Sequence, residues 1–84
     1  MERDLDISLF GRLADAFGPQ LNVALPAACS VRQLRELLAM KYPELAELMR
    51  SSRVRACIGD SIVSDDHLIG PREQVEFFPP VSGG

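Results

Sequence analysis

The sequence has few of the residues with which a small protein carries out chemistry by itself. Its 84 residues include no tryptophan, one histidine and two cysteines. His67 stands alone, and Cys29 and Cys57 are far apart, so the chain has neither a C-x-x-C pair nor a cluster with the spacing of metal ligands. We therefore expect no metal site, two free thiols, and no nucleophile and base pair for catalysis within this chain.

The chain also lacks a strong excess of positive charge and a long apolar run. It has 9 Lys and Arg against 12 Asp and Glu, and the cations are dispersed along the sequence. This excludes the basic stripe that is typical of nucleic-acid binding. No apolar run approaches the roughly 20 residues that span a bilayer, and the charged residues 1–4 do not resemble a signal peptide. We expect no membrane partner and a cytoplasmic location.

The length fits one domain. Alternation of apolar and polar residues predicts strands at residues 5–10, 20–25, 54–58, 62–63 and 74–78. Gly59-Asp60 predicts a tight turn between the third and fourth strands. In the first strand the alternation directs Leu5, Ile7 and Leu9 to the core. Phe10 and Phe78 are then expected on the opposite face of the sheet, with Ile62 as a neighbour, and the three would form an exposed apolar patch of the kind that marks a partner site.

Helices are predicted between these strands. Residues 11–17 have helical spacing and end at Gly18-Pro19. Ser30 and Gln33 form a capping box that starts the main helix, which ends near Tyr42, and a further helical turn follows Pro43. The main helix is expected to bury Val31, Leu34, Leu37 and Leu38 and to expose Arg32, Arg35, Glu36 and Lys41. The element order predicts an α+β fold in which one main helix packs on one face of a mixed sheet.

The end of the sequence has the composition of a reactive tail. Pro79 and Pro80 have no backbone N–H, so they end the last strand and favour a stiff, extended chain. Gly83 and Gly84 have no Cβ, and a narrow channel would need to fit only their backbone. We therefore divide the chain into a domain of residues 1–80 and a flexible Gly-Gly tail of residues 81–84, with the terminal carboxylate of Gly84 as the candidate reactive group.

Residues 76–84, together with residues 9–13, resemble the small, sulfur-carrying subunit of molybdopterin synthase. The family ending F-x-P-P-V-[ST]-G-G is matched by Phe77, Pro79, Pro80, Val81, Ser82, Gly83 and Gly84. The resemblance implies a ubiquitin-like β-grasp fold. Many members have Val-Asn where this chain has Ile58-Gly59, and glycine accepts the positive φ of such a turn at least as well as asparagine.

The resemblance also implies a mechanism and partners. An E1-like enzyme uses ATP to adenylate the Gly84 carboxylate, and a persulfide sulfur displaces AMP to leave a thiocarboxylate. The large synthase subunit then receives the tail, and sulfur passes to cyclic pyranopterin monophosphate in a heterotetramer of two small and two large subunits. No cofactor is bound by the chain itself. Partner contacts are expected at Phe10, Ile62, Phe78, Pro79, Pro80, Val81 and Ser82, with Gly83 and Gly84 as the reacting end.

Three alternatives remain at this point. A sulfur carrier of thiamine synthesis also ends in Gly-Gly, although it usually lacks the Phe-Pro-Pro segment. A ubiquitin-like modifier would pass the activated Gly84 to a lysine amine. A β-grasp binding module with an incidental Gly-Gly end would keep its function when Gly84 is deleted.

Overall fold

The computed structural model describes residues 2–26 and 28–79. Their elements follow the order β1 (Glu2–Leu9), α1 (Arg12–Phe17), β2 (Gln20–Pro26), α2 (Val31–Lys41), the short 3-10 helix η1 (Pro43–Leu45), α3 (Ala46–Arg50), β3 (Arg55–Ile58), β4 (Ser61–Val63) and β5 (Val75–Phe78). The predicted order of strands and helices is confirmed. The main difference at the boundaries is in β1, which begins at Glu2, three residues earlier than predicted, and ends at Leu9, so that Phe10 follows the strand. In addition, β2 includes Pro26, which is permitted because β2 is an edge strand of the sheet.

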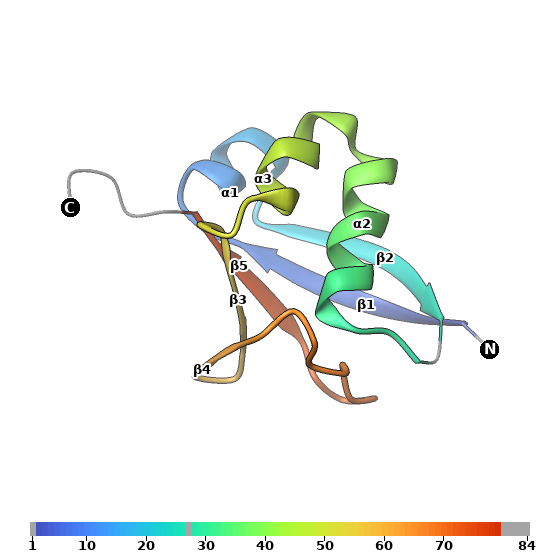
Figure 1. Cartoon of the computed structure of the whole chain (residues 1–84). Helices are drawn as coiled ribbons and strands as arrows, with labels where there is room; N and C mark the ends of the chain where they lie inside the picture. Colours follow the sequence, from blue (N-terminus) through green and yellow to red (C-terminus); the bar gives the residue numbers. More distant parts are fainter. Residues whose placement is uncertain (1, 27, 80–84) are drawn as a thin grey trace.

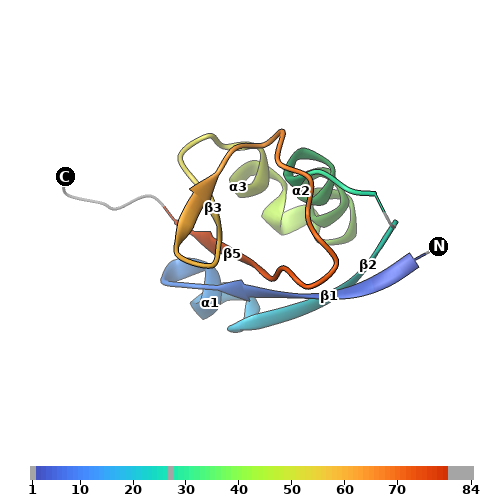
Figure 2. The same ribbon diagram turned by 90° about the horizontal axis from the view of Figure 1, so that it is seen from below.

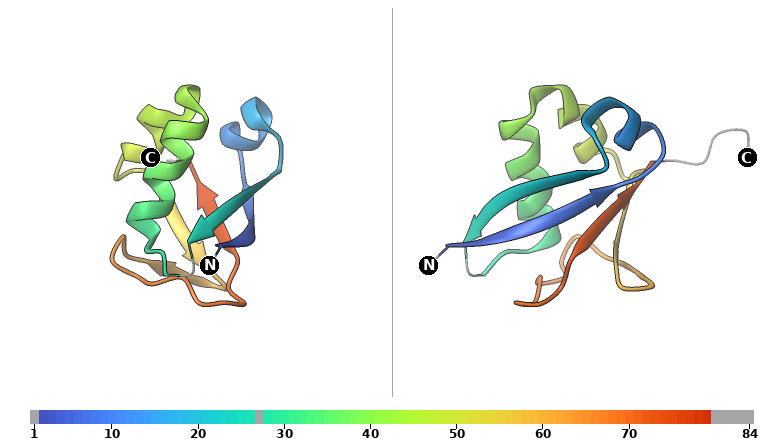
Figure 3. Two further views of the ribbon diagram at one scale, coloured as in Figure 1. Left: turned by 90° about the vertical axis from the view of Figure 1, so that its right-hand side faces the viewer. Right: turned by 180° about the vertical axis from the view of Figure 1, so that it is seen from behind.

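The strands form one mixed sheet in the order β2-β1-β5-β3-β4. The two central strands, β1 and β5, run parallel, and the other neighbours are antiparallel. The helices α2 and α3 lie over the same face of the sheet (Figure 1). Because β1 and β5 are parallel, their C-terminal ends lie on the same side of the sheet, beside α1 (Figure 3). The C-terminal segment begins on this side.

The core lies between the sheet and α2. Leu5, Ile7 and Leu9 of β1 are buried, as the alternation predicts, and they share the core with the apolar stripe of α2. This stripe comprises Val31, Leu34 and Leu38, each fully buried. Leu37, which we expected in the same stripe, is 36% exposed. The buried face of α2 is therefore narrower than its apolar sequence suggests.

The prediction that Arg35 lies on the exposed side of the main helix is wrong. Its side chain is buried, with the residue 8% exposed, and its guanidinium lies 5.4 Å from the centroid of the Phe77 ring. Its Nη atoms donate to the carbonyl oxygens of Met49 (2.9 Å), Ser51 (3.3 Å) and Val54 (2.6 Å). The carbonyls at the end of a helix have no partner within that helix. Arg35 donates hydrogen bonds to carbonyls of this kind at the end of α3 and in the segment that leads into β3.

The start of α2 is held by two sets of hydrogen bonds. The predicted capping box is present, since the Ser30 hydroxyl accepts from the Gln33 N–H and the Gln33 side chain accepts from the Ser30 N–H. The connection between β4 and β5 adds further acceptors, because the carbonyls of His67 and Asp65 accept from Val31 N–H and Arg32 N–H. Figure 2 shows this connection running past the beginning of α2. The long connection is thus joined to the main helix.

Candidate functional site

The candidate site begins where β5 ends. Leu9 of β1 pairs with Phe77 of β5, and the residues that follow them, Phe10 and Phe78, lie next to each other. Their rings stack with centroids 4.5 Å apart and planes inclined by 7°. An offset or stacked aromatic pair stabilises by roughly 1 kcal/mol beyond the area that it buries. The two phenylalanines that the alternation placed on the face opposite α2 are therefore in contact.

The predicted patch is only partly contiguous. Phe10 is 38% exposed and Phe78 is half-buried against it, and this pair leaves apolar surface available. Ile62 is 66% exposed, but it pairs with Cys57 on β3, and Cys57 in turn pairs with Glu76 on β5. Ile62 thus shares the sheet face with Phe78 but lies two strands away from β5. The predicted partner role of all three residues is still a prediction.

A glycine completes the surroundings of Phe78 and Pro79. Gly11 has φ 59° and ψ −134°, and a Cβ built on it would lie 2.9 Å from Cγ of Pro79. Glycine is therefore required here both for its backbone conformation and for the close approach of the proline ring. From the sequence, Gly11 is part of the predicted helical segment 11–17 and of the resemblance at residues 9–13, and neither assigns it this contact; its position directly after a strand is the available indication.

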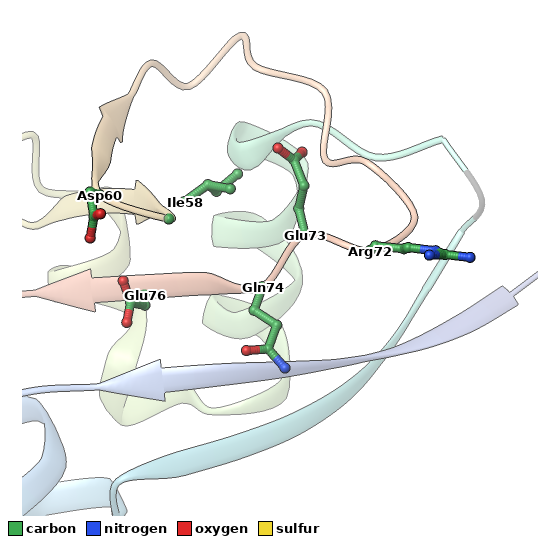
Figure 4. A pocket seen from close by; sticks show the side chains of 7 residues that line it. Ile58, Asp60, Arg72, Glu73, Gln74 and Glu76 are labelled. Carbon is green, nitrogen blue, oxygen red and sulfur yellow. The ribbon is translucent and has the colours of Figure 1, made fainter.

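A second region with charged side chains lies at the other end of β5. An open hollow of about 520 Å³ lies between the β3–β4 turn and the start of β5, and it is lined by Ile58, Gly59, Asp60, Arg72, Glu73, Gln74 and Glu76. Figure 4 shows that Arg72 extends away from Asp60 and Glu76, so no ion pair closes the hollow. Gly59 has φ 63°, and the predicted tight turn is present.

Glu73, one of the titratable groups that line this hollow, is already engaged. The Gly70 N–H donates to the Glu73 carboxylate at 2.6 Å, and His67 Nε2 lies 3.1 Å from the same oxygen. The Gly70 hydrogen bond first, and His67 second, hold the pKa of Glu73 below its ordinary value. The negative charge of the Glu73 carboxylate is thus stabilised by groups within the fold.

Neither thiol is suited to act as a nucleophile. Burial raises the pKa of Cys29, and burial followed by the nearby Glu76 carboxylate raises the pKa of Cys57. Both cysteines are free. Because the thiolate is the reactive form, a raised pKa keeps them protonated at neutral pH. Within residues 2–26 and 28–79, no three His, Cys, Asp or Glu side chains gather in a way that could hold a metal ion.

None of the helices in the described part of the chain is both long and apolar enough to cross a membrane.

The remaining predicted site residues are Pro80, Val81, Ser82, Gly83 and Gly84, and they lie outside the described residues. The structure therefore describes the base from which the tail begins, formed by Phe10, Gly11, Phe78 and Pro79. We call these four residues the exit corner.

Comparison with known proteins gives one family and several relatives. The ThiS family matches residues 7–84. The chain is 26% identical over 86 residues to the molybdopterin synthase sulfur carrier subunit of Arabidopsis thaliana, covering 96% of this chain and 83% of that protein. It is 25% identical over 80 residues to the protein of the same name in Escherichia coli, covering 95% of this chain and 99% of that protein.

The fold is also similar to that of a solved structure. The small archaeal modifier protein 1 of Methanosarcina acetivorans superposes with a TM-score of 0.79 at 21% identity, over 100% of this chain and 99% of that chain. The predicted ubiquitin-like β-grasp fold is confirmed. At this level of identity the superposition supports the fold alone.

Proposed function

The chain belongs to the ThiS family, and from this premise we propose that it is a sulfur carrier for molybdopterin synthesis. The observation that carries the proposal is the extent of the family match, which includes the β-grasp domain, the exit corner and the Gly83-Gly84 pair. The two curated relatives whose names specify this role each align with nearly the whole chain. In this proposal, sulfur is cargo that the Gly84 carboxylate accepts and later gives up.

Activation of Gly84 is the first step of the proposal. A carboxylate is a poor electrophile, and an E1-like enzyme would convert it to an acyl adenylate with ATP, in the cytoplasm. A persulfide sulfur would then displace AMP to form an acyl disulfide. A second thiol would cleave the S–S bond, which leaves a thiocarboxylate on the carrier and a disulfide on the sulfur donor. The thiocarboxylate is a softer and better nucleophile than the carboxylate, which suits it for the second step.

Sulfur donation is the second step. The large subunit of molybdopterin synthase would bind the apolar surface around Phe10 and Phe78 and receive residues 80–84 in its active site. Docking would make the attack of the thiocarboxylate on cyclic pyranopterin monophosphate effectively intramolecular. The partner would supply the acid, base and cation groups, because the described part of this chain offers two protonated thiols and an engaged Glu73.

Deletion of Gly84 tests whether function depends on this carboxylate. The last core residue described is Phe77, seven positions before Gly84, so the truncated protein should keep the unfolding free energy of the full chain. It should lose sulfur transfer to the large subunit completely. A truncated protein that still transfers sulfur would contradict the proposal and would favour a binding module with an incidental Gly-Gly end.

A ubiquitin-like modifier is the second candidate. The observation that favours it is the superposition on a protein whose name describes a modifier. Both functions share activation of the terminal glycine, so adenylation does not separate them. Incubation of a tagged carrier with a cell extract and ATP separates the two functions. A modifier produces a ladder of conjugates that are stable to thiols and base, whereas a sulfur carrier produces no such ladder.

A further inference from the structure

We infer that Gly11 is a positioning residue that fixes where and in which direction the chain leaves the domain at Pro79. The inference rests on the proposed function, since direction matters only if the residues beyond Pro79 must reach a site on another protein. It adds a residue that does not belong to the apolar patch. Its role is exerted through Pro79.

The contact between Gly11 and Pro79 has no room for a side chain. A Cβ on Gly11 would lie 2.9 Å from Cγ and 3.5 Å from Cδ of the proline ring. A separation below 3.0 Å means that one of the two groups must move. The ring of Pro79 thus lies directly against the backbone of Gly11, and its position follows from that of Gly11.

The backbone around Gly11 is itself held in place. Leu13 N–H donates to the Phe10 carbonyl at 3.2 Å, and Asp15 N–H donates to the Gly11 carbonyl at 3.1 Å. The Leu13 side chain is buried in the core. These contacts join the turn that contains Gly11 to the first turn of α1. A displacement of Gly11 would therefore disturb the packing of Leu13.

The other side of the exit corner is held by the aromatic stack. Phe78 directly precedes Pro79, and its ring lies against Phe10, which directly precedes Gly11. Two consecutive residues of one segment thus meet two consecutive residues of the other. One contact fixes a position, whereas two neighbouring contacts also fix a direction. The fixed φ of proline removes a further degree of freedom at this point.

The position of Pro79 sets the point from which residues 80–84 must enter the partner's active site. Five residues can reach at most about 16 Å. A displacement of the Pro79 ring away from that site therefore reduces the reach that remains for the reacting end. Misplacement of a reacting group by about 1 Å can lower a rate by roughly 100-fold. A small shift of the proline ring would therefore suffice to impair transfer when the domain itself is correctly docked.

Gly59 provides a matched control. It has φ 63°, close to the φ 59° of Gly11, so an alanine at either position adopts a positive φ. Gly18, with φ 90° and ψ 162°, matches Gly11 in ψ as well, because the ψ of −134° at Gly11 also lies outside the left-handed helical region. A Cβ on Gly59 meets no atom within 4 Å, whereas a Cβ on Gly11 meets Pro79. Gly18, with φ 90°, also has no atom within 4 Å of a built Cβ and serves as a second control. Comparison of the variants separates the effect of backbone strain from that of the contact.

The test is sulfur transfer from thiocarboxylate-loaded carrier to the large synthase subunit and cyclic pyranopterin monophosphate. We expect Gly11→Ala to lower kcat at least roughly tenfold, while KM for the carrier changes by less than about twofold. Gly59→Ala and Gly18→Ala should keep the wild-type kcat. Equal kcat for Gly11→Ala and the wild type, or an equal loss in Gly11→Ala and Gly59→Ala, would overturn the inference.

A second measurement does not depend on sulfur chemistry. In a double-mutant cycle of Gly11→Ala and Pro79→Ala, followed by thermal unfolding, removal of the proline ring should relieve most of the loss caused by Gly11→Ala. Additive effects would overturn the inference even if the single variant is too unstable to assay. If wild-type carrier transfers no sulfur but the cycle shows coupling, the proposed function fails while the Gly11 contact with Pro79 stands.

Discussion

The stacked pair of Phe10 and Phe78 connects the fold to the proposed partner. Phe10 follows one central strand and Phe78 ends the other, so their contact exists because β1 and β5 are parallel and in register. Each ring covers part of the other, and the pair still leaves apolar surface on the face without helices. A rigid, partly exposed aromatic pair is well suited to serve as an anchor in an interface.

Replacement of Phe78 tests this role. Phe78→Ala should weaken association with the large subunit by about 2 kcal/mol, because truncation of a central aromatic anchor typically has an effect of this size. Isothermal titration calorimetry measures the change. Met40→Ala is a suitable control, since Met40 is 76% exposed on α2, away from the exit corner. Unchanged affinity for Phe78→Ala would remove this residue from the interface.

Arg35 is a structural residue whose replacement should affect stability. Arg35→Met would remove the donor from the carbonyls of Met49 and Val54 and break the 2.9 Å ion pair of Arg35 with Asp65, while the Ser51 carbonyl would keep its hydrogen bond from Val54 N–H. The unfolding free energy should fall by about 3 kcal/mol. Arg35→Lys should restore little of it, because one ammonium group cannot reproduce the planar fork of a guanidinium.

Denaturant titration with Arg32→Met as the control checks the Arg35 prediction. Arg32 pairs with Asp66 at 2.6 Å, but both side chains are largely exposed, so its replacement should have a much smaller effect. Similar losses for the two variants would show that the buried hydrogen bonds contribute little.

The connection between β4 and β5 acts as part of the framework. Its carbonyls at Asp65 and His67 complete the start of α2, and Ile69 N–H donates to the Cys29 carbonyl. Within the connection, Glu73 binds Gly70 N–H and lies beside His67. Protonation or replacement of Glu73 is therefore expected to weaken the backbone hydrogen bonds that join this connection to the start of α2.

This arrangement predicts a dependence of stability on pH. The pKa of Glu73 is lowered in the folded protein, so its ionised form contributes stability that is fully present above the pKa of the unfolded chain, about 4.3. That contribution is lost as the pH falls through the lower, folded pKa. In acid, the unfolding free energy of the wild type should therefore decrease more than that of Glu73→Gln.

Denaturant unfolding at a series of acidic pH values measures this difference. Glu47→Gln, at an exposed position of α3, is the control and should follow the wild type. A Glu73→Gln curve parallel to that of the wild type would show that the Gly70 and His67 contacts do not couple to folding.

Local patterns predicted the elements well. Period-two alternation located the strands, and the capping box located the start of α2. Burial of Arg35 could not be predicted in this way, because it depends on carbonyls of residues 14 to 19 positions further along the chain. Helical periodicity depends only on the polarity of the side chains. It does not indicate which unpaired backbone carbonyls a side chain will contact in the folded protein.

For the candidate site, the sequence predicted the participants better than their arrangement. The expected face was correct for Phe10 and Phe78, because period-two alternation fixes the face of each strand residue. The distance of Ile62 from β5 followed only from the strand order. The contact of Gly11 with Pro79 joins residues 68 positions apart, and no local pattern contains it.

At the scale of the whole molecule, the fold separates a stable base from the proposed reactive end. The parallel central strands bring the exit corner to one edge of the sheet, and the charged hollow lies at the opposite end of β5. The described residues supply packing and the proposed partner surface, and the proposed chemistry resides in the Gly84 carboxylate and in the enzymes that act on it. The central claim is therefore that Gly84 carries sulfur.

Intact mass spectrometry of the purified protein tests this claim most directly. The protein is measured before and after incubation with the cognate adenylating enzyme, ATP and a sulfur source, and fragmentation locates any change. The account predicts a mass increase equal to the replacement of one oxygen by sulfur, located at Gly84. An unchanged mass with an adenylating enzyme shown to be active on this carrier family, or a sulfur located elsewhere in the chain, would contradict it.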